Sequence, residues 1–434
     1  MKQIASVLLA LIAIALPALG ETFLSVSDVH FNPFSDPALV PKLEAADVAE
    51  WQGILASSGT TAFTTYGSDI NDALFRSAVG EMHTQLPSPA FVLISGDFLA
   101  HDFQQNYQQY ATDKSQTAYT AFVAKTITYI ASVFRDAYPN VRIYPTLGNN
   151  DSDCGDYAVA PNGAFLKNFR DTWSTIVDSR SFERRFPAGG YYHADVPALD
   201  GVRIIAVNTN FFSVNYQNPC GTPGPDAGMR ELIWLDDELR LARDLGKRVW
   251  LLFHIPPGID VYDSVAKGAC PTPDSQTFWK KQYVEKYLAI VARHRGTIAG
   301  SFAGHTHQDE FRFAAGDFVH ITPSITPIFG NNPAFEIMNV RRNGDITGYT
   351  AWHLPNVTLP WVREYSFDGN YDNAALRQLA AKIDSDENTR VEYFTHMSSG
   401  APKSTAGALA KWQGYWCGFT AMNVKTFTSC YCTP

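Results

Sequence analysis

Short runs of apolar and β-branched residues, each ending in a polar or glycine-containing turn, recur along the chain and indicate buried strands. The five clearest runs are residues 23–28, 90–97, 141–148, 249–254 and 298–304. Between them lie stretches with helical periodicity, clearest at 117–137 and 229–245. In the second stretch, Leu232, Leu235 and Leu239 fall on one helical face. Strands that alternate with helices predict a layered α/β fold.

Two other segments have a different rhythm. Residues 191–208 and 311–352 hold strand-like runs separated only by short turns, such as the turn at 342–345. These segments predict antiparallel strands added to the sheet. From residue 370 the pattern becomes helical and rich in alanine and leucine. We therefore expect a main domain over 21–369 and a small helical C-terminal subdomain with a cysteine-bearing tail over 370–434.

The first twenty residues have the three parts of a secretory signal peptide. A positive charge at Lys2 precedes an apolar run over 7–16 and small residues over 17–20, and we expect cleavage after Gly20. No later stretch approaches the roughly twenty apolar residues that a membrane-spanning helix needs. The sequence predicts an exported protein without a membrane span, extracellular or periplasmic, or lysosomal or vacuolar in a eukaryote.

Composition narrows the class of protein. With 45% hydrophobic and 18% charged residues the chain is typical of a globular protein. A net charge of −9 without clusters of lysine and arginine argues against binding to the phosphate backbone of long nucleic acid. Six cysteines, an even number in an exported chain, predict disulfides, although their spacing does not fix the pairing.

Polar side chains follow the ends of the predicted strands, where the loops of an open α/β sheet face one crevice. They are Asp28, His30, Asp97, Asn149, His254, His305 and His307. Asp28 and His30 are two positions apart, so both project to the same side of an extended chain, and His305 and His307 repeat that spacing. The carboxylate of Asp97 can bridge two metals. One such residue at a strand end is more often structural, but their joint occurrence predicts a two-metal centre.

This ordered set resembles the signature of the calcineurin-like metallophosphoesterases, over about residues 21–354. Four further stretches resemble the acid sphingomyelinase-like phosphodiesterases of that superfamily, namely 96–102, 254–258, 304–310 and 323–333. The resemblance implies a β-sandwich core flanked by helices, in the order αββα. It also implies a metal-dependent hydrolase of phosphoric esters or anhydrides.

The resemblance also implies how the residues share the metals. Asp28, His30 and His307 would hold one ion, Asn149, His254 and His305 the other, and Asp97 would bridge. Histidine and carboxylate ligands suit Zn²⁺, with iron or manganese as alternatives. Two divalent ions less two carboxylates leave a positive site for a phosphoryl group, where a metal-bound hydroxide would attack phosphorus.

One position departs from the common family pattern. Asn150 stands where most of the superfamily has a histidine that contacts the phosphate, and asparagine cannot deliver a proton. By resemblance to the sphingomyelinase-like enzymes, His101 becomes the candidate general acid. The Asn-Asn-Asp sequence at 149–151 also resembles endopolyphosphatases. We expect Asp102, Asp151 and Asp309 to orient histidines rather than to bind metal.

The cysteine pairing and the substrate follow only from the resemblance. It implies a Cys220–Cys270 disulfide, with the tail cysteines pairing locally and one of them left for Cys154. The substrate would be a small phosphorylated molecule, of the nucleotide or polyphosphate type. The alternatives are a lipid hydrolase acting on sphingomyelin and a non-catalytic metal-binding protein on the same fold. The sequence does not indicate the oligomeric state.

Overall fold

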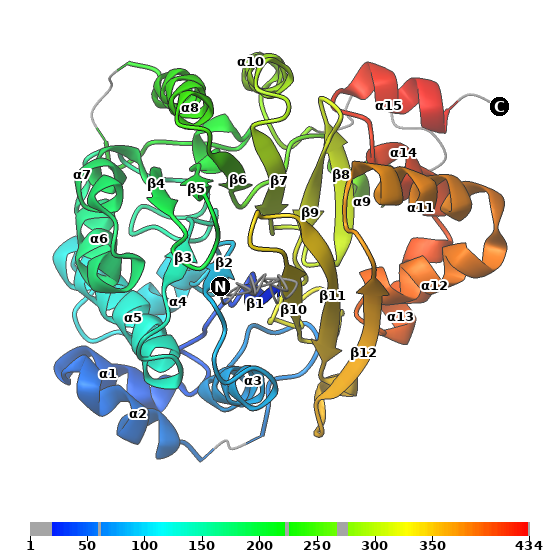
Figure 1. The fold of residues 1–434 in the computed structure, drawn as a ribbon. Coiled ribbons are helices and arrows are strands. Elements are labelled where there is room, and N and C mark those ends of the chain that lie inside the picture. Colours follow the sequence, from blue (N-terminus) through cyan, green and yellow to red (C-terminus); the bar gives the residue numbers. More distant parts are fainter. Residues whose placement is uncertain (1–19, 60–61, 222–224, 267–276, 433–434) are drawn as a thin grey trace, which may run out of the picture.

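Two six-stranded sheets stack face to face at the centre of the molecule (Figure 1). The computed structural model describes residues 20–59, 62–221, 225–266 and 277–432. The predicted signal peptide lies outside these residues, except for Gly20 at its end. No helix within the described ranges is long and apolar enough to cross a membrane.

The first sheet has the order β12-β11-β10-β1-β2-β3. Its strands, in chain order, are β1 (Glu21–Val26), β2 (Val92–Ile94), β3 (Ile143–Pro145), β10 (Ala334–Val340), β11 (Ile346–His353) and β12 (Val362–Asp368). β1, β2 and β3 are parallel, whereas β10, β11 and β12 continue the sheet antiparallel to their neighbours. The predicted antiparallel addition at this edge is confirmed.

The second sheet has the order β4-β5-β6-β7-β9-β8. Its strands are β4 (Tyr192–Asp195), β5 (Val202–Ala206), β6 (Arg248–Leu252), β7 (Ile298–Ala303), β8 (Glu310–Ala314) and β9 (Asp317–Ile321). The four middle strands are parallel, and β4 and β8 are antiparallel edge strands. The five predicted runs are all parallel strands of the two sheets. β5 and β9 lie in the segments predicted as antiparallel, and the prediction is half right there, since each is antiparallel to one neighbour and parallel to the other.

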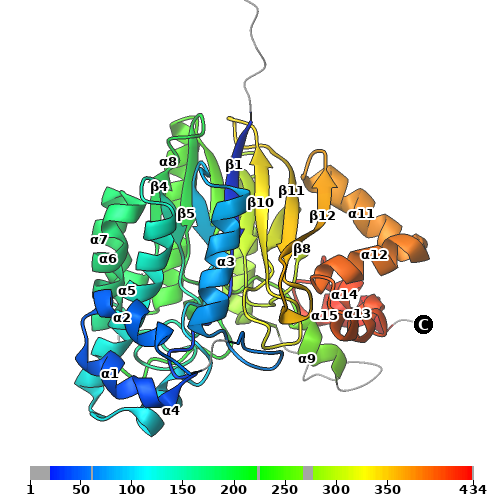
Figure 2. The ribbon, with the colours of Figure 1, turned by 90° about the horizontal axis from the view of Figure 1, so that it is seen from below.

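Helices cover the sandwich on both sides. Helices α1 to α7 gather on one side of the sheets and α11 to α15 on the opposite side (Figures 1 and 2). The helices are α1 (Val40–Ala45), α2 (Val48–Ala56), α3 (Asp72–Gln85), α4 (Phe103–Tyr110), α5 (Gln116–Ala137), α6 (Ala164–Val177), α7 (Arg180–Gly189), α8 (Ala227–Asp244), α9 (Val261–Ala266), α10 (Lys281–Arg293), α11 (Asn373–Ser385), α12 (Glu387–Met397), α13 (Pro402–Leu409), α14 (Trp412–Gly418) and α15 (Val424–Tyr431). This is the predicted α/β sandwich with a helical C-terminal region.

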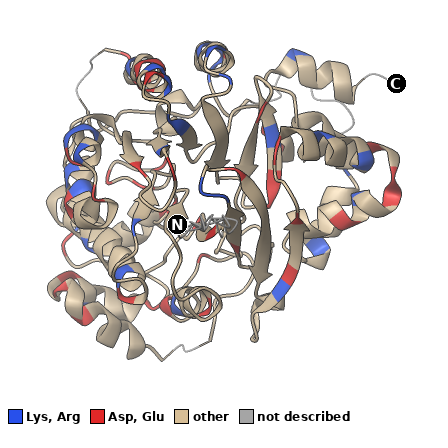
Figure 3. Cartoon of the chain, viewed as in Figure 1, with Lys and Arg blue, Asp and Glu red and all other residues tan. Residues whose placement is uncertain are grey.

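Aromatic side chains fill the space between the sheets. Phe23 on β1 lies 5.3 Å from Trp250 on β6 and 5.9 Å from Phe302 on β7, measured between ring centroids, and it stacks on Phe91 at 4.6 Å. All four side chains are fully buried. Burial of each large apolar side chain contributes about 1.5–3 kcal/mol. Charged residues lie mainly on the outer helices and loops (Figure 3). The packed interior fixes the positions of the strand ends.

The C-terminal helices pack on the second sheet and on the loops at one end of it. Phe419 stacks on Phe311 of β8 with ring centroids 4.6 Å apart, and its carbonyl accepts a hydrogen bond from the backbone N–H of Phe313. A disulfide between Cys417 and Cys430 joins α14 to α15. The predicted local pairing in the tail is therefore confirmed, and the division of the chain at residue 370 stays a proposal.

The predicted disulfide between Cys220 and Cys270 is wrong, as is the pairing of Cys154 with the tail. Cys154 is bonded to Cys220, with Cα atoms 5.7 Å apart. The reason is that the loops that hold them run side by side, since Gln217 donates its backbone N–H to the Tyr157 carbonyl at 2.9 Å. Cys270 lies outside the described residues.

Candidate metal centre

The loops that follow five parallel strands bring the predicted ligands together. Asp28 and His30 follow β1, Asp97 follows β2 and Asn149 follows β3, all in the first sheet. His254 follows β6, and His305 and His307 follow β7, all in the second sheet. Apart from Asn149, these side chains place nitrogen and carboxylate oxygen atoms in overlapping groups of three, within 4.8 Å of one another, and the group of His30 and His307 also includes His101. The cluster therefore spans the seam between the sheets.

Asp97 lies at the centre of the cluster. Its Oδ2 atom is 3.3 Å from His30 Nε2 and 3.2 Å from His254 Nε2. On one side, Asp28 Oδ1 lies 3.3 Å from His307 Nε2. On the other side, Asn149 Oδ1 lies 3.1 Å from His254 Nε2. This is where a carboxylate shared by two ions would lie.

His30 and His254 present one ring nitrogen to the cluster and anchor the other on a backbone carbonyl. His30 Nδ1 lies 2.9 Å from the Leu99 carbonyl, and His254 Nδ1 lies 2.7 Å from the Ser95 carbonyl. His30 Nε2 is buried and has no hydrogen-bond partner. Histidines that bind metals characteristically donate the other ring N–H to a carbonyl or carboxylate. The donor set therefore fits divalent metal ions.

Electrostatics in the cluster favours ionised carboxylates. Burial raises the pKa of Asp28, but the imidazoles of His307 and His30 outweigh burial and hold that pKa well below its usual value. Burial lowers the pKa of His305 and of His307 to about 3, so both are neutral. Ionised carboxylate and neutral imidazole are the forms that bind metals. Burial also lowers the pKa of His30 and of His254, but the Asp97 and Asp28 carboxylates outweigh it, holding the pKa of His30 well above its usual value and raising that of His254 to about 9. These two imidazoles are therefore cationic beside the carboxylates, and a bound metal ion would displace their protons.

Five of the seven residues have a left-handed backbone. The φ angles are +50° at Asp28, +47° at His30, +55° at Asp97, +76° at His305 and +63° at His307. Asp28 and His30 therefore converge through a bend and not along an extended strand, which corrects the expectation from their spacing. Non-glycine residues rarely adopt this conformation, and it clusters at functional sites.

Two glycines allow the loops after β2 and β3 to touch. A Cβ atom on Gly148 would lie 1.9 Å from Asp97 Oδ1, and one on Gly96 would lie 2.5 Å from the backbone nitrogen of Gly148. Gly96 also has a φ of +96°, which side chains disfavour. No other residue at position 148 would let Asp97 keep its place.

Asn150 points to Asp97 and not into the cavity. Its backbone N–H donates to Asp97 Oδ1 at 2.8 Å, and its side-chain amide donates to Asp97 Oδ2 at 3.0 Å. Asp151 accepts bonds from the backbone N–H groups of Gly148 and Phe98, at 2.8 and 2.6 Å. Both residues therefore hold the loops after β2 and β3 together around Asp97.

The expectation that Asp102, Asp151 and Asp309 orient histidines is wrong. Asp102 is exposed, Asp151 bonds backbone amides, and Asp309 accepts from the hydroxyls of Tyr349 and Tyr365. The backbone carbonyls already described orient His30 and His254. These hydrogen bonds come from neighbouring loops, and the spacing of residues along the chain does not reveal which loops are neighbours.

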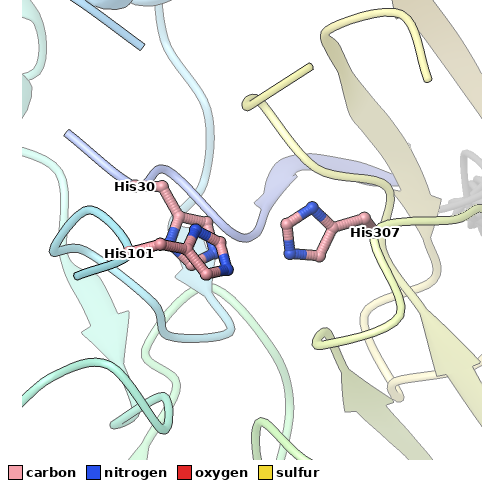
Figure 4. A group of neighbouring side chains, drawn as sticks. All are labelled: His30, His101 and His307. Carbon is pink, nitrogen blue, oxygen red and sulfur yellow. The ribbon is translucent and has the colours of Figure 1, made fainter. Parts of the chain in front are cut away.

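His101 lies beside the cluster and stacks on His30, with ring centroids 4.2 Å apart and ring planes 17° from parallel, while His307 faces the pair (Figure 4). The nitrogen lone pairs of an imidazole lie in the ring plane. Those of two nearly parallel stacked rings do not converge on one ion, so His101 is not a second ligand beside His30. It lines the cavity next to the cluster.

Asp69 is a residue of the site that the sequence did not reveal. Its carboxylate lies 3.0 Å from His101 Nδ1 and accepts the backbone N–H of His101 at 2.7 Å. It is 6% exposed. Burial raises the pKa of Asp69, but the hydrogen bonds from His101 and the charges of His30 and His101 together outweigh burial and lower that pKa. Asp69 precedes α3, 32 positions before its partner, and carries no motif.

A second buried group of histidine and carboxylates lies near β8, β9 and β10. In this group, His320 Nε2 is 2.7 Å from Glu336 Oε2, and its Nδ1 is 2.7 Å from the Tyr371 hydroxyl. Burial lowers the pKa of His320 to about 4. These are direct hydrogen bonds at 2.7 Å, whereas the distances from Asp97 Oδ2 to the two imidazole nitrogens are 3.2 and 3.3 Å. The group is a buried hydrogen-bond network that joins the two sheets.

A cavity of about 340 Å³ opens onto the cluster. Asp97, Asn149, His101, His305 and His307 line its inner end. Most of the rest of its wall is aromatic or acidic, formed by Asp156, Tyr157, Asp260, Tyr262, Asp263, Phe278, Glu310, Phe329 and Tyr415, and it is completed by Val261, Thr306, Gln308 and Arg312. A small molecule can therefore reach the cluster from this side.

Sequence comparison identifies the class of protein. Residues 22–309 match the family model described as calcineurin-like phosphoesterase, so the chain belongs to that family. It is a hydrolase of phosphoric esters, with a fold that implies divalent metal ions at the cluster.

Several relatives of defined activity are similar to the chain. Sphingomyelinase phosphodiesterase D of Dictyostelium discoideum is 26% identical over 85% of this chain and 84% of its own length. Human acid sphingomyelinase-like phosphodiesterase 3b is 23% identical over 94% of this chain and 89% of its own. The mouse cyclic GMP-AMP phosphodiesterase SMPDL3A is 27% identical over 52% of this chain and 51% of its own. The chain is thus similar to phosphodiesterases with different named substrates.

Proposed function

We propose that the chain hydrolyses phosphodiester or phosphoanhydride bonds of small soluble molecules, of the nucleotide or polyphosphate type. The observation that carries the proposal is the position of Asp97, whose Oδ2 atom lies 3.3 and 3.2 Å from the Nε2 atoms of two histidines from different sheets. A buried carboxylate between two imidazoles that are fixed by backbone carbonyls is suited to bind two cations at once. It suits a purely structural role poorly.

The ligand assignment follows the two sides of Asp97. Asp28, His30 and His307 would hold one ion, and Asn149, His254 and His305 the other. When bound, two divalent cations supply Lewis-acid charge that polarises a phosphoryl group and acidifies water. The mixture of imidazole and carboxylate favours Zn²⁺, and iron and manganese are the alternatives to test.

The chain's own residues supply orientation and a proton. Asn150 fixes Asp97 through two hydrogen bonds and has no proton to give at neutral pH. His101 is anchored by Asp69 through Nδ1, which leaves Nε2 as the atom that can carry a proton to a leaving oxygen. Phosphate and nucleotide leaving groups need that proton less than an alkoxide does, which favours them over a ceramide leaving group.

Export of the protein is part of the proposal. The disulfides Cys154–Cys220 and Cys417–Cys430 suit an oxidising compartment, as does the signal-like sequence of residues 1–20. Extracellular, periplasmic and lysosomal locations all meet that requirement.

Turnover with and without metal tests the proposal. Purified protein is assayed on bis(4-nitrophenyl) phosphate, a nucleoside triphosphate, polyphosphate and dispersed sphingomyelin, before and after removal of metal with a chelator. We expect turnover of the soluble substrates, its loss on chelation, and its return with Zn²⁺, Fe²⁺ or Mn²⁺. A clear preference for sphingomyelin would favour the lipid hydrolase instead. Two bound metals without turnover of any substrate would favour a non-catalytic protein.

A further inference from the structure

A short segment that follows the loop of Asn149, residues 154–157, contacts two candidate ligands that are assigned to the same ion. Asp156 Oδ1 accepts a hydrogen bond from the side-chain amide of Asn149 at 2.8 Å. The Tyr157 backbone N–H donates to the Asn149 carbonyl at 2.9 Å. The Tyr157 hydroxyl lies 3.4 Å from His305 Nε2. One segment therefore bears on both Asn149 and His305.

The contact with Asp156 fixes which end of the Asn149 amide faces the cluster. An amide has an oxygen that can bind a cation and an NH₂ group that cannot. Asn149 is 6% exposed, and Asp156 lies beside it on the cavity. Because Asp156 accepts from Nδ2, Oδ1 is left for the cluster, where it lies 3.1 Å from His254 Nε2. Without an acceptor at position 156, rotation of the amide by half a turn would present NH₂ to the ion.

A neighbouring loop holds the segment in place. Cys154 is bonded to Cys220, and the Tyr157 carbonyl accepts the backbone N–H of Gln217 at 2.9 Å. Tyr157 has a φ of +50°, a left-handed conformation that persists in a non-glycine residue only when the surrounding structure imposes it. These contacts fix where the side chains of Asp156 and Tyr157 lie.

The candidate ligands of the other ion have different neighbours. His30 is anchored by the Leu99 carbonyl, and Asp28 accepts a hydrogen bond from the Ser27 hydroxyl at 2.5 Å. In the described part of the chain, no hydrogen bond or ion pair joins segment 154–157 to Asp28, His30 or His307. The segment therefore acts on one side of the centre.

We propose that segment 154–157 positions the ligands of one ion, with Asp156 orienting Asn149 and Tyr157 supporting His305, so that loss of these contacts weakens the binding of that ion and leaves the other in place. This inference rests on the proposed function, because it uses the ligand assignment made there, and it adds that the two ions are unequal. Outer partners of metal ligands typically change metal affinity by roughly 10- to 100-fold.

Three variants separate the hydrogen bonds from charge. Asp156→Leu keeps a similar side-chain size but cannot accept a hydrogen bond, whereas Asp156→Asn keeps an acceptor oxygen and removes the charge. Tyr157→Phe removes only the hydroxyl beside His305, and it tests the inference independently if Asp156→Leu does not fold. Asp153→Leu is the control, because it removes a carboxylate of the same loop that bonds Thr120 instead of a ligand.

Metal affinity, and not turnover, is the quantity to measure. Each protein is freed of metal with a chelator, checked for its fold by circular dichroism, and titrated with Zn²⁺ by calorimetry. Titration with Co²⁺ gives a second measurement, because the visible absorption of Co²⁺ depends on the ligands around each ion. We expect the parent to bind two ions per chain.

In Asp156→Leu we expect the affinity of one ion to fall roughly 10- to 100-fold, with an altered Co²⁺ spectrum for that ion alone. Tyr157→Phe should weaken the same ion to a smaller extent. Asp156→Asn and Asp153→Leu should bind both ions as the parent does, because the acceptor beside Asn149 is kept in each.

Parental affinity for both ions in Asp156→Leu and in Tyr157→Phe overturns the inference and leaves the proposed function standing. Equal weakening of both ions does the same. An Asp156→Asn protein as weak as Asp156→Leu also overturns the inference, since the charge of Asp156 and not the orientation of Asn149 would then control affinity. A parent that binds no Zn²⁺ overturns both the inference and the proposed function.

Discussion

At the scale of single residues, Asp97 is the position where most interactions meet. Its carboxylate is approached by two imidazoles, and it accepts two hydrogen bonds from Asn150. A carboxylate with this many partners cannot be replaced by an amide without leaving some of them unpaired. Gly148 also lies so close to the Asp97 carboxylate that a side chain at position 148 would clash with it.

The variant Asp97→Asn should lose metal and activity together, because each ion would lose an anionic ligand. The loss should exceed the roughly 10–100-fold cost of removing an outer hydrogen-bond partner. Elemental analysis and turnover of bis(4-nitrophenyl) phosphate measure it. The control is Asp102→Asn, which changes an exposed carboxylate five positions along the chain. Two metals per chain and normal turnover in Asp97→Asn would show that Asp97 does not bridge.

The effect of replacing Asp69 on kcat should depend on the leaving group of the substrate. In Asp69→Asn, His101 keeps a neighbour but loses the negative charge beside Nδ1. We expect kcat to fall roughly 10- to 100-fold for phosphodiesters with alkoxide leaving groups, and far less for 4-nitrophenolate, which leaves without a proton. A purely structural role would lower both rates alike.

His101→Ala should show the same dependence on the leaving group, with a larger effect. Asp72→Asn is the matched control for Asp69→Asn, because Asp72 lies three positions after Asp69 and accepts a hydrogen bond from the Tyr129 hydroxyl. If Asp69→Asn slows both substrate classes equally while Asp72→Asn is silent, Asp69 supports the local fold and does not position His101.

At the scale of elements, helix α8 supports the centre through a buried chain of polar contacts. Glu231 on α8 is 0% exposed, and its Oε1 atom accepts the backbone N–H of Asn208 at 2.6 Å. Two residues further along, the Asn210 amide donates to the Gly148 carbonyl at 2.8 Å. The loop that carries Asn149 is thereby tied to a helix on the outside of the second sheet.

Glu231 should make stability depend on pH. Burial raises its pKa well above the usual value, so the folded protein keeps a proton that the unfolded chain releases above about pH 4.5. Stability is fully present below that pH and falls as pH rises towards the folded pKa. Glu231→Gln removes this loss. The unfolding free energy of the variant relative to the parent should rise by about 1 kcal/mol or more from pH 5 to pH 8.

Urea unfolding of both proteins at the two pH values measures this difference. Any fixed packing change in the variant cancels between pH 5 and pH 8. Glu238→Gln on the same helix is the control, because burial and the ion pair with His193 act in opposite directions there and its pKa is lowered. An unchanged difference between Glu231→Gln and the parent would mean that Glu231 is ionised in the folded protein.

The elements were more predictable than the loops between them. Apolar runs that end in Asp, His or Gly predict the parallel strands, and Leu232, Leu235 and Leu239 predict the buried face of α8. The sequence could not reveal the left-handed backbone at Asp28, because conformation in a loop depends on its neighbours. It could not reveal Asp69 for the same reason, since that contact forms across separate loops.

At the scale of the whole molecule, the described disulfides join segments that lie outside the two sheets. Cys154–Cys220 closes a sequence separation of 66 residues and joins the loop after Asn149 to the one that contains Gln217. Cys417–Cys430 joins α14 to α15 within the C-terminal helices, which contribute Tyr415 to the cavity. The cysteine pairing implied by the family resemblance is wrong here because it does not take into account which loops lie side by side.

Peptide mapping under non-reducing conditions should find Cys154 linked to Cys220 and Cys417 linked to Cys430. The double variant Cys154→Ser, Cys220→Ser should unfold more easily, by about 2–4 kcal/mol, because the unfolded chain gains freedom. A peptide that links Cys220 to Cys270 would instead contradict the pairing. Thermal unfolding with and without reducing agent gives the independent measurement.

The left-handed backbone at five candidate ligands has a consequence for descendants of this chain. Each non-glycine residue held there costs on the order of 1 kcal/mol, and glycine would remove the cost. A mutation such as His305→Gly would therefore remove a candidate ligand and this backbone strain at the same time. Because the relief of strain offsets part of the packing and chain entropy that such a mutation costs, catalysis can be lost along this route at a small cost in folding unless selection for turnover opposes it.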